Sequence, residues 1–333
     1  MKILFFDTRA STNKLDYFSY YSGLFQELNL IADVDLIKGP ISELPNGASQ
    51  KYDAIVFGLG WFANESPAYY QKIKGLKESK IPVVCNLHKV ANQTRDKINF
   101  LRQNSVDLTL MSPGFVTRFQ DKFEDLRFEL FPFAANEKIF FSNTKPRNIE
   151  IGFSGALHTL HNKGVNEEIK NGFTKQKAQL RTKMFEIISD KFSETKSFIN
   201  TGITNSPLPE NKYAEILRDT LVWFATDSPA EEVSPRHYEV MLSKTALMCN
   251  EIPVPYRGIF VDGINCIEFR DDLSDFEKKL RYYLNNKPEL DKIVLTAYDD
   301  AVANHTWANR AKSLINKIED VRLKKQNRNI NGE

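Results

Sequence analysis

Short apolar runs rich in β-branched and aromatic residues alternate along the chain with longer amphipathic stretches. The runs have the length and composition of buried strands, and helical periodicity is present between most of them, for example at residues 66–79 and 92–104. Strands that alternate with helices predict crossover connections and a parallel sheet. Within the first 140 residues the predicted strands are 2–7, 33–38, 53–59, 82–87, 107–112 and 128–133.

A segment of turn-forming and charged residues, "NEKIFFSNTKPRN" (136–148), interrupts this alternation and is predicted to be a linker. The alternation then resumes with a helix at 178–192, and the chain ends in helical patterns at 273–286, 288–305 and 306–325. The strands predicted for this second part are 149–157, 196–202, 221–227, 245–251 and 265–270.

These patterns predict an α/β protein with two Rossmann-like domains that face each other across a cleft, followed by C-terminal helices. The expected boundaries are residues 1–140 and 146–305, with residues 306–333 forming a helix that returns toward the first domain and ends in a frayed basic tail. Ligands of such sheets bind at the carboxyl ends of the strands, so these ends are where the functional residues are sought.

Composition narrows the class of protein. The 333 residues are 41% hydrophobic and carry a net charge of only +2, which gives no electrostatic indication of nucleic-acid binding. The three cysteines are widely separated, which favours a reducing compartment. No apolar run approaches the length of a membrane span, and the N-terminus is interpreted as a strand. We therefore expect a cytoplasmic protein, with at most a peripheral membrane contact.

One short segment after the predicted strand 221–227 combines several features of an anion site. In "EEVSPRHYEVML" (231–242), Ser234 can cap a helix and Pro235 suits its first position. The start of a helix carries backbone N–H groups without partners, and these groups bind anions. Arg236 adds a guanidinium, and Glu231 and Glu239 add carboxylates. The segment is predicted to lie at the carboxyl edge of the second sheet.

A second glycine-containing motif is interpreted differently. "GLGWFA" (58–63) has the G-x-G-x-x-A spacing of a dinucleotide-binding loop. It follows the third strand, however, and a polar stretch separates it from the next expected helix. At the end of the following strand, Asn86 and His88 stand where an acid for a ribose would be expected. A turn between strand and loop is the favoured interpretation, and a dehydrogenase is rejected.

Taken together, the chain resembles the GT-B glycosyltransferases, within them the CgeB-like or group 1 branch. The resemblance covers most of residues 149–318 and rests on three pieces. They are "IEIGFSGALH" with the helix "LRTKMFEIIS", the run from "YAEILRDTLVWFATD" through "SPRHYEVML" to "TALMCNE", and a tail containing "HTWANR". The N-terminal half agrees only in its fold pattern and in a histidine after a strand.

The resemblance implies roles for particular residues. Glu231 would contact the donor sugar, with Glu232 as a competitor, and Glu239 would hydrogen-bond the ribose hydroxyls. The remaining donor-binding residues are expected to be Gly155, Arg181, Arg236 and Tyr238. Lys163 is a rival to Arg181 for the diphosphate. His88 matches the histidine that related proteins place at a strand end, where it could orient the sugar or shuttle a proton.

Structural alternatives remain open for most of these residues. Glu239 could only compensate the helix dipole, and Arg181 could belong to a solvated helix face. His158 and His161 are interpreted as a solvated loop rather than a metal site. The acids from Asp271 to Asp275 are interpreted as helix caps rather than metal ligands.

The predicted function is transfer of a sugar from a UDP- or GDP-linked donor to the hydroxyl of a glycan or other acceptor. No cofactor and no essential metal are expected, and the resemblance favours retention of anomeric configuration. Aromatic residues of N-terminal loops could stack on an acceptor sugar; they are Tyr17, Tyr20, Tyr21 and Trp61. The alternatives are a nucleotide-sugar epimerase or hydrolase of the same fold, and a non-catalytic nucleotide-sugar or glycan-binding protein.

Overall fold

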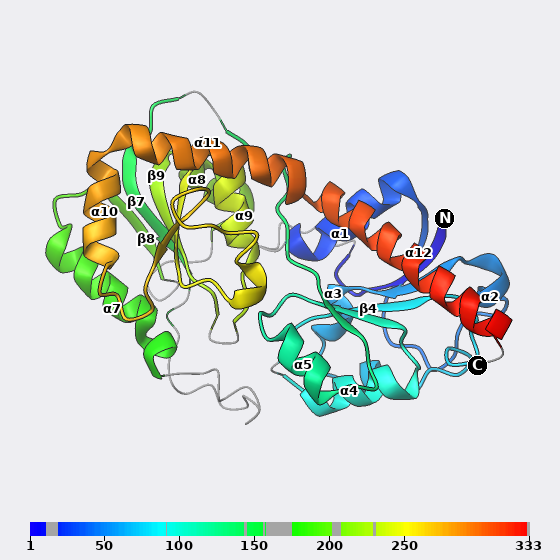
Figure 1. Cartoon of the computed structure of the whole chain (residues 1–333). Helices are drawn as coiled ribbons and strands as arrows, with labels where there is room; N and C mark the ends of the chain where they lie inside the picture. The colour runs from blue at the N-terminus through cyan, green and yellow to red at the C-terminus, as the bar shows by residue number, and fades with distance from the viewer. Residues whose placement is uncertain are drawn as a thin grey trace. The chain divides into compact units, whose positions relative to one another are not determined.

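The structure is a computed structural model, and it describes residues 1–10, 19–90, 92–142, 145–155, 157, 175–201, 208–228 and 231–331. The chain divides into two compact units (Figure 1). The first comprises the described parts of Met1–Asn13, Tyr20–Pro132 and Trp307–Glu333, and the second those of Lys14–Ser19 and Phe133–Thr306. Each unit is built around one parallel sheet.

The first unit contains a six-stranded parallel sheet in the order β2-β1-β3-β4-β5-β6. All six strands occur where the apolar runs predict them, and the four inner strands are almost wholly buried, as expected for a sheet that is covered on both faces. The strands are β1 (Lys2–Phe6), β2 (Asp33–Ile37), β3 (Ala54–Phe57), β4 (Val83–Leu87), β5 (Leu108–Met111) and β6 (Phe128–Leu130). The helices are α1 (Ser19–Ile31), α2 (Ala48–Lys51), α3 (Leu59–Phe62), α4 (Thr94–Gln103), α5 (Val116–Lys122) and α12 (Trp307–Asn331).

The helix predicted at residues 66–79 is wrong. Only one 3₁₀ turn, Pro67–Tyr70, forms there. Beyond it the backbone forms hydrogen bonds with other parts of the unit. The Ile73 N–H donates to the side-chain oxygen of Asn104 at 2.8 Å, and Lys74 forms an isolated β-bridge with Glu43. Gly75 then adopts φ +82°, which a helix excludes.

The second unit contains a five-stranded parallel sheet in the order β11-β10-β9-β7-β8. Its strands also match the predicted runs: β7 (Ile149–Ser154), β8 (Ser197–Asn200), β9 (Thr220–Ala225), β10 (Ala246–Asn250) and β11 (Ile267–Phe269). The helices are α7 (Lys175–Lys191), α8 (Glu210–Arg218), α9 (Pro235–Leu242), α10 (Phe276–Asn285) and α11 (Lys287–Asn304), with a 3₁₀ turn at Val254–Tyr256. Phe153, Phe224 and Met248 on neighbouring strands pack against Met184 of α7 in its core.

The strand order identifies where a ligand would bind in each sheet. In the second unit the chain passes from β7 to β8 on one side and then returns to β9 on the other side of β7. The order therefore reverses between β7 and β9, and open α/β sheets bind ligands beside the carboxyl ends of the strands at such a point. The corresponding point in the first unit lies between β1 and β3.

The last helix, α12, belongs to the first unit. Its first residue, Trp307, packs closely against Gly23 of α1, where an added Cβ would lie 2.3 Å from the indole ring. Arg310 donates from Nε to the carbonyl of Pro132 at 2.8 Å, and Lys325 pairs with Asp107 at 2.7 Å. These contacts join both ends of the helix to residues that adjoin β5 and β6.

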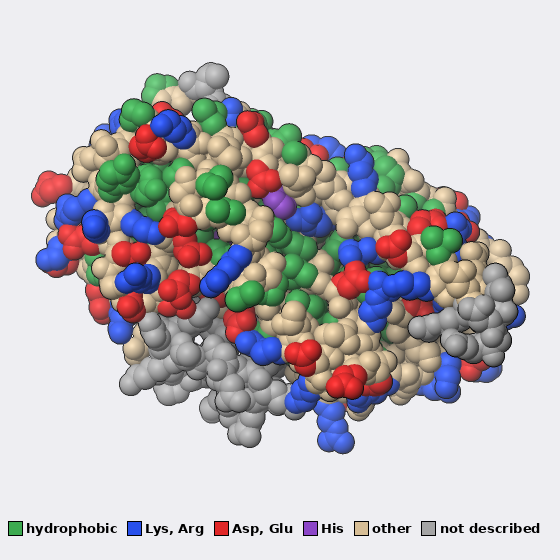
Figure 2. Space-filling model, viewed as in Figure 1, with side chains coloured by type: hydrophobic (Ala, Val, Ile, Leu, Met, Phe, Trp, Pro, Cys, Tyr) green, Lys and Arg blue, Asp and Glu red, His purple; other side chains and the backbone are tan. Residues whose placement is uncertain are grey.

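On the face of the molecule drawn in Figure 2, acidic and basic side chains are interspersed over both units, as expected from the small net charge of +2. Across the described part of the chain, none of the helices combines the length and the apolar character that crossing a membrane requires.

Candidate functional site in the second unit

Two guanidinium groups converge at the carboxyl end of β7, where the strand order reverses. Gly155 follows this strand with φ +153°, a conformation that favours glycine. A Cβ built on Gly155 would lie 3.1 Å from Nη1 of Arg236 and 3.4 Å from Nη1 of Arg181. The structure thus brings together three of the residues that the sequence predicts as donor-binding, and a Cβ at Gly155 would crowd the Arg236 guanidinium in particular.

Arg181 is contributed by α7 and is only 8% exposed. The alternative of a solvated helix face is therefore wrong for this residue. Its Nε donates to the Thr226 hydroxyl at 2.8 Å, which fixes the guanidinium beside the end of β9. The pKa of Arg181 is lowered to about 9, mainly by burial and then by the charge of Arg236, while Asp227 opposes the shift. A buried cation next to a second cation is destabilised until an anion arrives, which favours anion binding.

Arg236 lies in the first turn of α9, the helix that follows β9. Ser234 and Pro235 occupy the predicted capping and first helical positions, but Ser234 makes no side-chain capping hydrogen bond, so that part of the prediction is wrong. The Ser234 hydroxyl lies 3.4 Å from Nδ1 of His237 instead. The Nε of Arg236 is buried and has no hydrogen-bond partner among the described residues. A buried donor of this kind is stabilised when a ligand supplies an acceptor.

Glu239 is one turn further along α9, on the same face as Arg236. Burial raises the pKa of its carboxyl to about 7; the Arg236 charge opposes this shift and the Glu210 charge adds to it. A carboxyl that titrates near neutral pH beside an arginine is a common feature of ligand sites, and the alternative of simple dipole compensation does not require burial.

The two residues between Arg236 and Glu239 face the interior. His237 and Tyr238 are both fully buried. Burial lowers the pKa of His237 to about 3, so it is neutral at pH 7. The ring of Tyr238 packs against Phe260 and His305, with centroid distances of 5.3 and 5.2 Å. The role of Tyr238 at the donor stays a prediction.

Glu231 lies in the loop between β9 and α9. It has φ +54°, and its backbone N–H donates to the carbonyl of Ser228 at 2.8 Å, which closes a tight turn. Its competitor Glu232 donates from its own N–H to the Ser228 hydroxyl at 3.3 Å. Both side chains are partly exposed, and the turn does not decide which of them would meet a sugar.

His88 belongs to the first unit, at the end of β4, and is 5% exposed. Its Nε2 lies 3.1 Å from the hydroxyl of Tyr21, whose ring also carries the Arg9 guanidinium at 4.7 Å. Burial lowers the pKa of His88 to about 3, with smaller contributions from Lys89, Lys97 and Arg9. A neutral imidazole of this kind can orient a hydroxyl group, but it is a weak base at pH 7.

The motif 58–63 has a structural explanation in the first unit. Gly58 and Gly60 lie at the start of the one-turn helix α3, and the carboxylate of Asp7 packs against both of them. Asp7 accepts hydrogen bonds from the N–H groups of Gly60, Arg9 and Ala10 at 2.9, 2.6 and 3.1 Å. A Cβ on either glycine would come within 2.2 Å of that carboxylate. The glycines therefore accommodate a protein carboxylate, which explains the G-x-G-x-x-A spacing at residues 58–63 without a dinucleotide.

Some predicted features fall outside the described residues. They are Lys163 as a rival of Arg181, the pair His158 and His161, and Tyr17.

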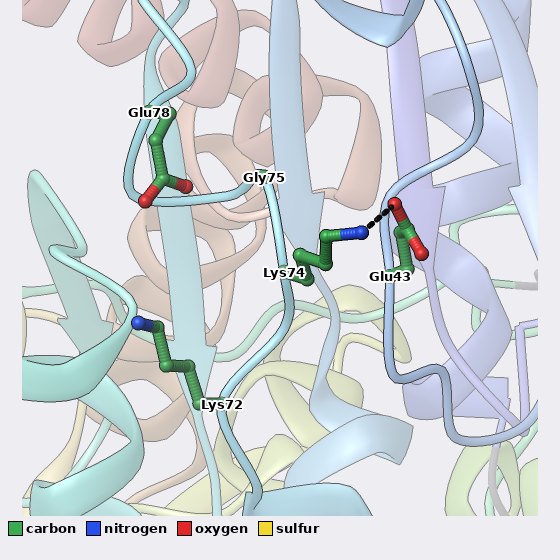
Figure 3. A pocket seen from close by; sticks show the side chains of 5 residues that line it. All are labelled: Glu43, Lys72, Lys74, Gly75 and Glu78. Atoms are coloured by element: carbon green, nitrogen blue, oxygen red, sulfur yellow. Dashed lines mark ion pairs between the residues drawn. The ribbon is translucent and has the colours of Figure 1, made fainter.

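The first unit also has a surface pocket of about 430 Å³, lined by Glu43, Lys72, Lys74, Gly75 and Glu78 (Figure 3). Lys74 points at Glu43, with 3.0 Å between Nζ and the carboxylate. Because two lysines and two glutamates line it, the pocket has no net charge to select a charged ligand, and it contains none of the predicted site residues.

Glu239 gives the site a testable pH dependence. Its carboxyl has a pKa of about 7 in the folded protein and 4.5 as a free side chain, so the unfolded chain ionises first as the pH rises. The folded state therefore loses stability between pH 4.5 and 7. We expect Glu239→Gln to match wild type in melting temperature at pH 4.5 and to exceed it by a few degrees above pH 7. Thermal unfolding at both pH values measures this, with the exposed Glu194→Gln as control. If the melting temperatures of Glu239→Gln and wild type differ by the same amount at both pH values, the buried position of the Glu239 carboxyl is contradicted.

Comparison with solved structures places the chain in a class of fold. Sucrose-phosphate synthase (tll1590) from Thermosynechococcus elongatus superposes with a TM-score of 0.59 at 8% identity, over 96% of this chain and 99% of that one. Anabaena Alr3699/HepE in complex with UDP-glucose superposes with a TM-score of 0.56 at 12% identity, over 96% of this chain and 100% of that one. A glycosyltransferase from Rickettsia africae ESF-5 superposes with a TM-score of 0.55 at 9% identity, over 96% of this chain and 98% of that one. The fold, with its two Rossmann-like units, is that of the GT-B glycosyltransferases, as predicted.

A family model described as glycosyl transferase-like matches residues 171–316, which lie mostly within the second unit and contain Arg181, Arg236 and Glu239. A comparison with curated proteins gives no match. The CgeB-like branch stays a prediction.

Proposed function

We propose that this protein is a glycosyltransferase that moves a sugar from a nucleoside diphosphate donor to the hydroxyl of an acceptor glycan. The observation that carries the proposal is the convergence of Arg181 and Arg236 on Gly155 beside the first turn of α9. Two guanidinium groups and the N-terminal amides of a helix match the charge and hydrogen-bonding needs of a diphosphate. The glycosyl transferase-like model over residues 171–316 agrees with this assignment.

In this mechanism the arginines act on the leaving group. Negative charge accumulates on the diphosphate as the bond to the sugar breaks, and Arg181 and Arg236 are positioned to stabilise it. Hydrogen bonds to charged groups contribute roughly 1.5–3 kcal/mol each. Because the two guanidinium groups already supply positive charge at this point, we propose that transfer needs no divalent metal ion.

The remaining site residues have complementary roles in the proposal. Glu239 accepts hydrogen bonds from the ribose hydroxyls, which a carboxylate suits because it offers two acceptor oxygens. Glu231 contacts the donor sugar from the loop after β9. His88, neutral at pH 7, orients a sugar hydroxyl. We further propose that the transferred sugar retains its anomeric configuration, as the resemblance to group 1 enzymes implies.

UDP-glucose is the first donor to test, because the superposed Anabaena protein was solved in complex with it. We expect the purified protein to transfer sugar from a UDP- or GDP-linked donor to an added acceptor at the same rate with and without EDTA. Release of the nucleoside diphosphate measures the rate, and proton NMR of the product identifies its anomer.

Complete loss of activity on chelation would contradict the metal-free mechanism. If the donor is epimerised or hydrolysed at the same rate with and without an acceptor, the protein is the alternative, a nucleotide-sugar epimerase or hydrolase. Nucleotide binding without turnover of any donor would identify a binding protein.

A further inference from the structure

One buried amide joins the carboxyl ends of three neighbouring strands in the second sheet. Asn250, the last residue of β10, is 1% exposed, and β10 lies between β9 and β11. Its Oδ1 accepts from the N–H of Asp227 at 3.0 Å, while its Nδ2 donates to the carboxylates of Asp227 at 2.7 Å and Asp271 at 2.8 Å. Asp227 follows β9, and Asp271 follows β11. A single side chain thus holds the segments that follow both neighbouring strands.

The partners of the Asn250 amide determine its orientation. Its NH2 group donates one hydrogen bond to each carboxylate, whereas the reversed amide would place an acceptor oxygen against two carboxylates and a donor against the N–H of Asp227. The backbone N–H and the carboxylate of Asp227 are therefore both bound to the same amide. Because of these two bonds, the peptide that joins Thr226 to Asp227 is held in one orientation.

This peptide carries the hydrogen-bond partner of Arg181. The hydroxyl of Thr226, a residue that is 3% exposed, accepts from Nε of Arg181 at 2.8 Å. While Nε is held there, Nη1 of the same guanidinium lies 3.4 Å from the position of a Cβ on Gly155. A cation that is held in place before its ligand arrives loses less conformational freedom on binding, so such support raises affinity.

We propose that Thr226 and Asn250 are positioning residues of the diphosphate site: Asn250 fixes the segment after β9, and Thr226 aims Arg181 at the leaving group. This inference rests on the proposed function and extends it from the residues that meet the diphosphate to two that act through Arg181. Substitution of either residue should weaken binding of a nucleoside diphosphate and leave binding of the nucleoside unchanged, because Arg181 acts only on the diphosphate.

The test is a double-mutant cycle that combines Asn250→Ala with Arg181→Gln. Isothermal titration calorimetry compares UDP with uridine, and GDP with guanosine. We expect Asn250→Ala to weaken diphosphate binding by about tenfold, as for one hydrogen bond to a charged group, and to keep nucleoside affinity within about twofold of wild type. In the Arg181→Gln background the same substitution should cost less than about twofold, because the guanidinium through which it acts is already absent. Asn285→Ala, at an exposed asparagine of α10, is the matched control.

Three results would overturn the inference: an unchanged diphosphate affinity in Asn250→Ala, an equal loss for nucleoside and diphosphate, or a full loss that persists without Arg181. The proposed function survives all three, because wild type still prefers the diphosphate. No binding of UDP or GDP by wild type would overturn both. If Asn250→Ala does not fold, Thr226→Val and Thr226→Ser replace it. Loss of the diphosphate preference in Thr226→Val with recovery in Thr226→Ser supports the inference, whereas a preference kept in Thr226→Val, or lost in both, overturns it.

Discussion

Replacing Arg236 with glutamine is expected to reduce kcat/KM for the nucleotide-sugar donor by about 100-fold or more. The substitution removes a guanidinium whose Nη1 lies near Gly155 and whose buried Nε has no hydrogen-bond partner among the described residues. Loss of charge-assisted contacts to a diphosphate of roughly 1.5–3 kcal/mol each accounts for a factor of this size. The effect should appear in kcat as well as KM, because negative charge on the diphosphate is greatest in the transition state.

Arg257→Gln is the control for this experiment. Arg257 is an exposed arginine of the same unit, at the end of the 3₁₀ turn Val254–Tyr256, and its removal changes the net charge by the same amount. We expect its kcat/KM to remain that of wild type. A fall of less than threefold in Arg236→Gln, with an unchanged melting temperature, would remove Arg236 from the mechanism.

Replacing Gly152 with alanine is expected to destabilise the second unit by about 3 kcal/mol, toward the upper end of the usual cost of overpacking. Gly152 lies in the middle of β7, and an added Cβ would be 2.1 Å from Cε3 of Trp223 and 2.9 Å from Cγ2 of Thr220. Trp223 is fully buried on the neighbouring strand, so it cannot move away without disturbing the core around it.

Urea unfolding followed by tryptophan fluorescence measures this effect. The matched control is Gly258→Ala, since a Cβ at Gly258 has no atom within 4 Å. We expect Gly258→Ala to unfold at the wild-type midpoint and Gly152→Ala at a clearly lower one. Equal midpoints for the two variants would show that β7 and β9 do not approach as closely as the structure has them.

The sheets were predictable from the sequence because most of the inner strands are apolar runs that are buried on both faces. Such runs form strands in many different surroundings, as β4 and β9 do here. Residues 66–79 have helical periodicity too, but their conformation depends on partners distant in sequence, Asn104 and Glu43. Local pattern contains no information on those partners, so the predicted helix was wrong.

The residues of the candidate site also divide into those that a local sequence pattern identifies and those that depend on partners distant in sequence. Arg236 and Glu239 could be identified because a helix start directly after a strand is a local feature with a known affinity for anions. Tyr213 of α8, whose ring centroid lies 5.9 Å from the Arg236 guanidinium, could not, because α8 and α9 are brought together only by packing on β9. Asp7 was missed for a similar reason: its carboxylate fills the loop at Gly60, which lies far along the chain.

The central claim is that Arg181 and Arg236 form a diphosphate site around Gly155. The most direct test is calorimetric titration of UDP and of uridine into wild type and into the double variant Arg181→Gln/Arg236→Gln. We predict that the diphosphate raises affinity at least 100-fold over the nucleoside in wild type, and that the double variant binds UDP and uridine with nearly equal affinity. A double variant that keeps the full advantage of UDP would contradict the account.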